Sequence, residues 1–225
     1  MPNTKHAYEH VWGIYLPIAI VVFAIVVGTL VVLLGVGARR SRPDRRSKAL
    51  PLEIGYAFVL ACVAAFLVWV TFRAETPIDR LVARPGLRIK VIAAQWSWRF
   101  IYSNGVQVAD IDTWHPTPAY VPTGTEIEFS GTSEDVIHGF FLPELHYQRQ
   151  VLPGYTTHFD LIFEKPGLYQ GECSVLCGED HSEMHFAVEA VSPAPFQEWL
   201  AREGTRIREG SSAQTAGATA RGPST

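Results

Sequence analysis

The sequence predicts a hairpin of two transmembrane helices followed by an all-β sandwich domain, with a short C-terminal helix and a disordered tail. Two observations predict this order. Uncharged, apolar residues are concentrated before residue 73, and the rest of the chain has short β-rich runs separated by Gly and Pro turns. Of the 225 residues 48% are hydrophobic and the formal net charge is -3, so nothing in the composition indicates a nucleic-acid partner.

The first predicted transmembrane helix covers residues 14–37, which carry no charged side chain. At about 1.5 Å per residue it is about 36 Å long, enough to cross a hydrocarbon core of about 30 Å. Pro17 near its start is tolerated in a membrane helix. The apolar run is too long for a signal peptide and is followed by Arg39 and Arg40 instead of a small-residue cleavage site, so we expect an uncleaved anchor.

The second predicted transmembrane helix covers residues 54–72, which are uncharged and would extend about 29 Å. We expect Cys62 inside it to be a small buried apolar residue. The loop between the two helices, "ARRSRPDRRSK" at residues 38–48, is strongly basic, and short basic loops stay in the cytoplasm. Residues 1–77 are therefore predicted to anchor a C-terminal domain outside the cytoplasm.

The C-terminal domain is predicted to cover residues 78–205. Its β-rich runs include "VIAAQWSWRFIY", "TEIEFSGT", "THFDLIFE", "GLYQGEC" and "HFAVEAV", which favour an antiparallel sandwich or a small barrel. Ser192 as an N-cap and Pro193 at the first helical position predict a helix near 195–203. Residues 206–225 are predicted to be disordered because they have no apolar periodicity.

A short segment of the domain holds most of the chain's sulfur. Cys173, Cys177, His181 and Met184 follow one another as C-x3-C-x3-H-x2-M. A disulfide is one interpretation, because Cys173 and Cys177 lie in an oxidising compartment, but the bridge would close a very small loop and leave the histidine and methionine unexplained. Structural zinc is a second interpretation, with His185 pairing with His181, although zinc has little use for a thioether.

Copper is the third interpretation, because thiolate, imidazole and thioether are the soft ligands that copper selects. Two thiolates four residues apart can each bridge two metal ions, so a second imidazole is needed from elsewhere. His138, in the turn-flanked stretch "SEDVIHGFFLPELH", is the best candidate on position alone. The rival histidines of the same domain are His115, His146, His158 and His185.

Three segments together resemble cytochrome c oxidase subunit II, a family with a binuclear CuA centre: "DVIHGFFLPEL", "QWSWRFIY" and "GECSVLCGEDHSEM". The resemblance extends from Val11 to about Leu200 and implies that the sandwich is cupredoxin-like. It implies His138 as the upstream ligand. One copper would take His138 and Met184, the other His181 and the backbone carbonyl of Val175. Both thiolates, from Cys173 and Cys177, would bridge the two ions.

The resemblance also implies the function and the partners. Cytochrome c would donate electrons, and a haem- and copper-bearing subunit I, beside a subunit III, would use them to reduce oxygen to water. The protein would be a multi-pass protein of the cell inner membrane with its copper domain on the periplasmic side. The alternative function is a membrane-anchored copper electron-transfer protein without an oxidase partner. A copper-free quinol oxidase subunit is disfavoured by the cysteines, and nitrous oxide reductase by its greater length and solubility.

Trp96, in the Q-W motif, matches the tryptophan at which electrons enter in the family, while Trp98, Phe100 and Tyr102 are expected to be core aromatics. Glu53, before the second transmembrane helix, matches a family glutamate linked to proton uptake, although the residues around it differ. Acidic residues near the two metal-bearing segments either are solvated loop residues or attract a basic donor. They are Glu134, Asp135, Glu179, Asp180 and Glu183.

Two departures from the family fall where subunit I is expected to dock. Val175 stands where the family has a glutamate whose side chain binds Mg, and the K-x-D motif before "PG" is replaced by Gln148–Gln150. A backbone carbonyl survives any side chain, but valine cannot bind Mg. We therefore expect metal analysis of the whole complex to find no Mg of the usual kind. Mg bound beside Val175, for example through Glu172, would contradict this.

Overall fold

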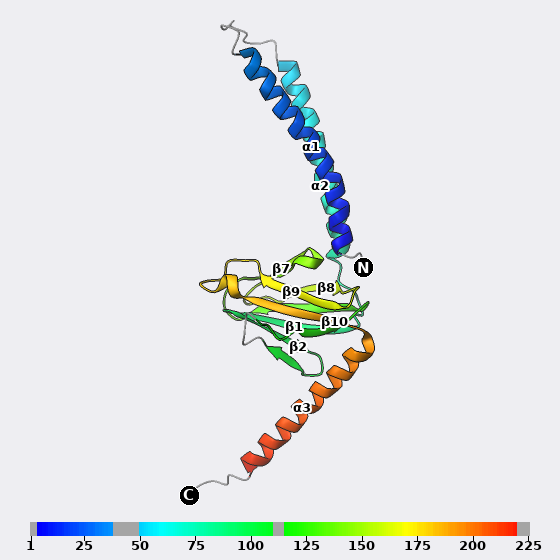
Figure 1. The fold of residues 1–225 in the computed structure, drawn as a ribbon, viewed down its shortest axis with the longest axis vertical. Helices are drawn as coiled ribbons and strands as arrows, with labels where there is room; N and C mark the ends of the chain where they lie inside the picture. Colours follow the sequence, from blue (N-terminus) through cyan, green and yellow to red (C-terminus); the bar gives the residue numbers. More distant parts are fainter. Residues whose placement is uncertain (1–3, 38–49, 110–114, 220–225) are drawn as a thin grey trace. The chain divides into compact units, whose positions relative to one another are not determined.

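The computed structural model describes residues 4–37, 50–109 and 115–219 (Figure 1). The chain forms two compact units, one essentially of residues 6–77 and the other of residues 78–225. The basic loop at residues 38–48, on which the predicted orientation depends, lies outside the described residues, as do the last residues of the predicted tail, 220–225.

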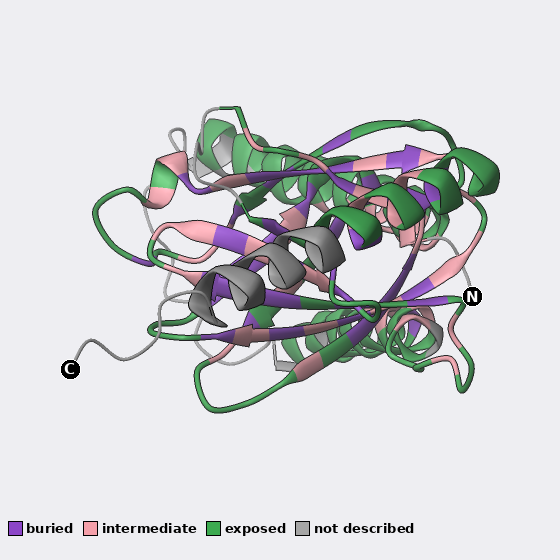
Figure 2. Ribbon diagram, turned by 90° about the horizontal axis from the view of Figure 1, so that it is seen from below, coloured by how far each residue is buried: buried purple, intermediate pink, exposed green. Residues whose placement is uncertain are grey.

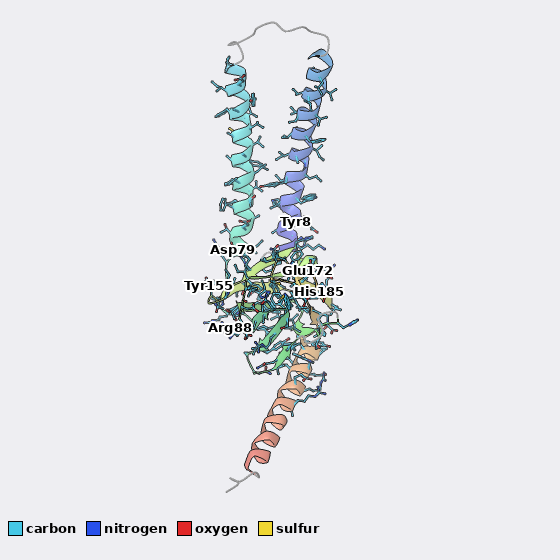
Figure 3. The ribbon with its side chains drawn as sticks, turned by 90° about the vertical axis from the view of Figure 1, so that its left-hand side faces the viewer. Tyr8, Asp79, Arg88, Tyr155, Glu172 and His185 are labelled. Carbon is cyan, nitrogen blue, oxygen red and sulfur yellow. The ribbon has the colours of Figure 1, made fainter. Side chains whose placement is uncertain are left out.

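The first unit is a pair of long helices, α1 (Thr4–Gly37) and α2 (Leu50–Ile78), which run side by side in Figure 3. Both contain a span long and apolar enough to cross a membrane, Thr4–Val32 in α1 and Glu53–Thr76 in α2. The Tyr15 hydroxyl of α1 donates to the Leu67 carbonyl of α2 at 2.9 Å. Cys62 is exposed on α2, so the expectation that it is buried is wrong for this chain.

The second unit is a sandwich of two five-stranded sheets. One sheet has the strand order β3-β2-β1-β5-β8 and the other β4-β10-β9-β6-β7. The strands of the first sheet are β1 (Leu87–Ala94), β2 (Ser97–Tyr102), β3 (Gln107–Ala109), β5 (Glu126–Ser133) and β8 (Thr157–Ile162). Those of the second are β4 (Ala119–Pro122), β6 (His138–Leu142), β7 (Tyr147–Val151), β9 (Gly167–Cys173) and β10 (His185–Val191). Two short 3-10 helices, η1 (Pro143–Leu145) and η2 (His181–Glu183), interrupt the loops.

Both sheets are mixed, whereas the sequence predicted an antiparallel sandwich. The strand pairs β1–β5 and β4–β10 are parallel, and the other named pairs are antiparallel. Parallel neighbours need a long connection between them, and each of these two pairs is separated along the chain by several intervening strands. Alternation along each strand shows which side faces the core but not the direction of its neighbour, so the sequence left this open.

Aromatic side chains from both sheets fill the core. Phe140 of β6 lies with its ring centroid 4.5 Å from that of Phe186, 5.2 Å from that of Phe159 and 5.8 Å from that of Trp98. Buried positions alternate with less buried ones along β2, β5 and β9, whereas β6 is buried at four of its five positions. Figure 2 shows both kinds of residue along the strands, while most of the first unit is exposed. Trp98, Phe100 and Tyr102 are buried here, as the sequence predicted.

The C-terminal helix α3 (Pro193–Thr219) begins where the sequence predicted it and is much longer than expected. Its first turns are anchored by Phe196, which is buried, and by Trp199, whose ring lies 5.2 Å from that of Tyr102 and 4.9 Å from that of Tyr120. The structure has helix as far as Thr219, where the sequence predicted disorder from residue 206. An anchored helix propagates at little cost per residue where no proline interrupts it, and none lies between Pro195 and Pro223.

Glu128 of β5 holds a charged cluster on the outer side of the first sheet. Its carboxylate accepts a hydrogen bond from Arg88 Nε at 2.9 Å and lies 3.1 Å from His158 Nδ1; Arg88 is labelled in Figure 3. The hydrogen bond from Arg88 lowers the pKa of Glu128 below its ordinary value; burial opposes this shift, and the hydrogen bond from His158 adds to it. A carboxyl whose pKa is lowered by folding stabilises the fold above its unfolded pKa.

Glu128→Gln is therefore expected to destabilise the second unit by about 0.2–1 kcal/mol at pH 7, because a partly exposed ion pair contributes only that much. The difference in unfolding free energy between the variant and the wild type should disappear as the pH falls from about 4.3 through the lowered pKa of Glu128. Below that pKa the carboxyl group is protonated in both the folded and the unfolded chain. Denaturant unfolding at pH 7 and pH 3 measures both free energies, with the exposed Glu164→Gln as the control. A difference that stays constant with pH would show that the charge of Glu128 contributes nothing.

Candidate metal centre

The two metal-bearing segments meet where β6 begins and β9 ends. β6 and β9 pair in antiparallel fashion with Phe140 opposite Cys173. Beyond this pair, the Ser174 N–H donates to the Gly139 carbonyl at 3.0 Å, which places His138 next to the loop that follows β9. At the other end of that loop the Cys173 N–H donates to the Met184 carbonyl at 3.0 Å. The loop is therefore closed on itself and fixed to β6.

All the ligand atoms expected from the sequence lie in this one place. Cys173 Sγ is 3.7 Å from Cys177 Sγ and 3.9 Å from His138 Nδ1. Cys177 Sγ is 3.5 Å from His181 Nδ1 and 3.8 Å from Met184 Sδ. The Val175 carbonyl accepts a hydrogen bond from Cys173 Sγ at 3.2 Å. The imidazole of His138 and the two thiols form a group whose ligand atoms all lie within 4.8 Å of one another, close enough to share a metal ion.

The structure also separates His138 from its rivals. His158, on β8, lies against Glu128 of β5. His146 follows η1 and has a left-handed backbone, with φ 48°. His115 and His185 line a different cavity, of about 480 Å³, on the outer side of the second sheet. There His185 is paired with Glu172 across β9 and β10, and the two are labelled side by side in Figure 3.

The two alternatives to copper fit this geometry less well. Cys173 and Cys177 are free thiols whose sulfur atoms are well beyond the roughly 2.05 Å of a disulfide. The zinc site suggested by the sequence pairs His181 with His185, but His185 lines the separate cavity on the outer side of the second sheet. A zinc site made of the two thiols with His138 and His181 would leave the Met184 thioether, 3.8 Å from Cys177 Sγ, without a role. The donors that do converge include two thiols, two imidazoles and a thioether, which is the soft set preferred by copper, and a backbone carbonyl lies beside them.

Burial shields the ligands from water on all but one side. His138 and Met184 have no exposed surface, and Cys173 and Cys177 are 6% and 3% exposed. His181 and Val175 are half-buried, and Leu176 between the thiols is 80% exposed. The ligand set is thus built on the buried ends of two strands and reaches the surface at the loop.

Asp135 orients His138, a role that the sequence analysis missed. Its Oδ1 lies 2.9 Å from His138 Nε2, so the other ring nitrogen, Nδ1, faces Cys173. A carboxylate on the far nitrogen of a metal-binding histidine fixes the tautomer and the ring orientation. Burial by itself raises the pKa of Asp135, but hydrogen bonds from His138 and from the backbone N–H groups of Gln95 and Val136 lower it to about 2. The i, i+3 spacing in D-V-x-H was the signal that could have indicated this contact.

The two thiols are not equivalent. Burial raises the pKa of both. For Cys173, the hydrogen bonds with His138 and with the Gly139 N–H outweigh burial and lower the pKa of the thiol. For Cys177, the neighbouring charge of Cys173 adds to burial and raises the pKa. One thiol is therefore already inclined to ionise, as a metal ligand must.

The remaining predicted residues lie in different surroundings. Trp96, half-buried, lies in the turn between β1 and β2 next to Gly178, one residue after Cys177. Glu134 forms an ion pair with Arg99 at 2.6 Å, and Glu179 and Asp180 are exposed on the loop. Glu53 is exposed in the first turn of α2, in the other unit, and its link to proton uptake stays a prediction.

Comparisons with known proteins place the chain among relatives of one kind. Residues 115–191 match a family model described as cytochrome c oxidase subunit II, periplasmic domain. The chain is 32% identical to cytochrome c oxidase subunit 2 of Yarrowia lipolytica, over 66% of this chain and 69% of the relative. It is 30% identical to the probable cytochrome c oxidase subunit 2 of Streptomyces coelicolor, over 72% of this chain but only 64% of that protein's length.

Among solved structures, the periplasmic domain of subunit II of cytochrome oxidase (CoxB) from Bradyrhizobium japonicum is similar. It is 27% identical with a TM-score of 0.53, and the match covers 56% of this chain and 99% of that one. Together with the two apolar helices, these likenesses indicate a membrane-anchored protein that carries a cupredoxin-like domain of the periplasmic type.

Asp135→Asn is expected to weaken metal binding by about 10–100-fold, because a hydrogen-bonded carboxylate that orients a metal ligand typically contributes that much to the affinity. The amide keeps the shape of the side chain but removes its charge. Competition between the metal-free chain and a chromophoric copper chelator measures the affinity. The neighbouring Glu134→Gln, which is 55% exposed and paired only with Arg99 in the described structure, serves as the matched control. Equal affinities for Asp135→Asn and the wild type would rule out the orienting role.

Proposed function

This chain belongs to the cytochrome c oxidase subunit II family, and we propose that it accepts electrons from a cytochrome c at a binuclear copper centre. It then passes them to a haem- and copper-bearing subunit I, where oxygen is reduced to water. The observation that carries the proposal is the convergence of two thiols, two imidazoles and a thioether in one buried cluster.

The donor set fits two metal ions better than one. Each thiol has an imidazole of its own, His138 beside Cys173 and His181 beside Cys177, and the two sulfur atoms lie between them. We assign Met184 and the Val175 carbonyl as the remaining ligands. A pair of copper ions bridged by both thiolates would supply a single one-electron store shared between two metals.

The chain's own contribution is to hold these ligands still. Backbone hydrogen bonds close the loop at Cys173 and Met184 and fix it to Gly139, and Asp135 fixes the ring of His138. Burial excludes water from the sulfur atoms. A ligand set that is already in place reorganises little when one electron arrives or leaves, which is the same advantage that preorganised polar groups give an enzyme.

Electrons would arrive through Trp96. Its indole is half-buried and lies beside Gly178, so it joins the surface of the domain to the residue that follows Cys177. The exposed carboxylates of Glu179 and Asp180 lie on the same loop and would steer a basic donor toward it. Asp135 does not belong to this group, because its carboxylate is already engaged by His138.

Subunit I would dock on the copper loop. Leu176 is 80% exposed, and Val136 and Ile137 on the adjoining β5–β6 loop are 37% and 40% exposed. Exposed apolar residues that gather beside a functional site are typical of a protein interface. We further propose that a subunit III completes the complex and that both helices span the inner membrane with the sandwich on the periplasmic side. Val175 would leave the usual Mg position at that interface without its carboxylate.

An electron paramagnetic resonance spectrum of the copper-loaded full-length chain tests the proposal. One electron shared equally by two copper nuclei, each of spin 3/2, gives a seven-line hyperfine pattern, whereas a single copper gives four lines. We expect two copper ions per chain and seven lines. Cys177→Ser should lose copper and the seven-line pattern, because one bridge is removed.

Cys62→Ser is the matched control. It is exposed on α2, outside the sandwich, and should change neither copper content nor spectrum. Four lines from the wild type, or full copper content with an unaltered spectrum in Cys177→Ser, would refute a shared copper pair. Purification of the chain without a haem-bearing subunit would favour the carrier function instead.

A further inference from the structure

Gln95 touches both metal-bearing segments of the domain, although it is not a ligand. It lies in the turn between β1 and β2, immediately before Trp96. Its backbone N–H donates to Asp135 Oδ2 at 2.7 Å, and its side-chain Nε2 donates to the Cys177 carbonyl at 2.7 Å. Gln95 thus connects the carboxylate that orients His138 with the loop that carries the second thiol.

Gly178 brings Gln95 and Trp96 close to the backbone of that loop. Its φ is 131°, in the range that favours glycine. A Cβ at this position would lie 2.8 Å from Gln95 Nε2 and 3.2 Å from both Nε1 and Cζ2 of Trp96. The carboxamide and the indole therefore pack directly against the residue after Cys177, with no room for a side chain between them.

The Trp96 indole packs against the hydrophobic core of the sandwich, and no hydrogen bond in the described structure fixes its orientation there. Its Nε1 is buried and finds no hydrogen-bond acceptor among the residues that the structure describes. The pairing of Ala94 with Ser97 is the last one before the turn, so Gln95 and Trp96 lie beyond the sheet register. Within this two-residue turn, the Gln95 side chain donates a hydrogen bond to the copper loop, at the Cys177 carbonyl.

We propose that Gln95 is a positioning residue, which holds the Trp96 indole against the loop of Cys177 and so sets the rate at which electrons enter. This inference rests on the proposed function. In the step concerned the reduced cytochrome c loses one electron and the copper centre gains one, with no proton transferred and no bond made or broken.

The position of the hydrogen bond separates this role from metal binding. Gln95 Nε2 binds the carbonyl of Cys177 and not its sulfur, and the Gln95 side chain is largely exposed. Loss of that side chain should leave the ligands, which backbone hydrogen bonds and Asp135 hold, in place. The indole would then lose a polar neighbour that is fixed to the loop, and electron transfer slows as the distance between the indole and the loop grows.

The experiment uses the copper-loaded full-length chain with Gln95→Met, which keeps the length of the side chain and removes its donor. Copper content, the hyperfine pattern and the first-order rate of reduction are measured, the last in a preformed complex with photoreduced cytochrome c. We expect unchanged copper content and hyperfine pattern, and a rate several-fold lower than that of the wild type. Gln107→Met, on the exposed edge strand β3, is the matched control and should match the wild type in all three.

A double-mutant cycle with Trp96→Phe shows whether Gln95 acts through the indole. If it does, Gln95→Met should lower the rate no further once Trp96 is replaced, because the two effects share one contact. Effects that simply multiply would overturn the proposal. A rate within twofold of the wild type in Gln95→Met, or loss of copper from that variant, would overturn it as well. Should Gln95→Met fail to accumulate, Gln95→Leu removes the same donor without adding a charge and carries the same expectations.

Failure of the inference is distinguishable from failure of the proposed function. A wild-type chain that binds two copper ions and is reduced by cytochrome c, with Gln95→Met equally fast, overturns the role of Gln95 alone. A wild-type chain that lacks the seven-line pattern overturns the copper centre, and the positioning role goes with it.

Discussion

The antiparallel contact between the start of β6 and the end of β9 is the constraint on which the candidate metal centre depends. It brings His138 next to Cys173, which lies 35 positions further along the chain. Two hydrogen bonds make this contact: the Ser174 N–H donates to the Gly139 carbonyl, and the Gly139 N–H donates to Cys173 Sγ at 3.5 Å. Gly139 is required there, since a Cβ would collide with the Ser174 hydroxyl. Without this close approach the two thiols would have only one imidazole.

Burial and polarity are balanced around that contact. The ligands lie at the edge of an aromatic core, where Trp98 packs its ring 6.1 Å from that of His138 and against Phe140 and Phe186. An imidazole without exposed surface needs a partner for each nitrogen, and His138 has Asp135 on one side and Cys173 on the other. The same polar network reaches the surface through Gln95, whose neighbour Trp96 lies beside the copper loop, so a dry ligand set and a partly accessible aromatic ring belong to one structure.

The two units of the chain differ in the side chains that they expose, and so in the surroundings that suit them. The helices expose large apolar side chains along their length, as a lipid environment requires, whereas the sandwich keeps its aromatic residues inside and its charged residues outside. The helix pair is held by side-chain to backbone contacts such as Tyr15 to Leu67. The sandwich is held by register and aromatic packing. This division is already visible in the sequence, because the apolar excess stops near residue 73.

Local pattern determined much of this protein: the apolar runs of both helices, the alternation of the strands, and the spacing from Cys173 to Met184 that places a metal-binding loop after β9. A resemblance carried by three motifs selected His138, which spacing alone left among several histidines. The tertiary structure decided the rest. It made two strand pairs parallel, extended α3 to Thr219, turned Asp135 from a surface acid into the partner of His138, and placed Gln95 on the Cys177 carbonyl. The physical reason is that periodicity reports which face of an element is buried, whereas contacts between distant segments depend on how those faces are brought together.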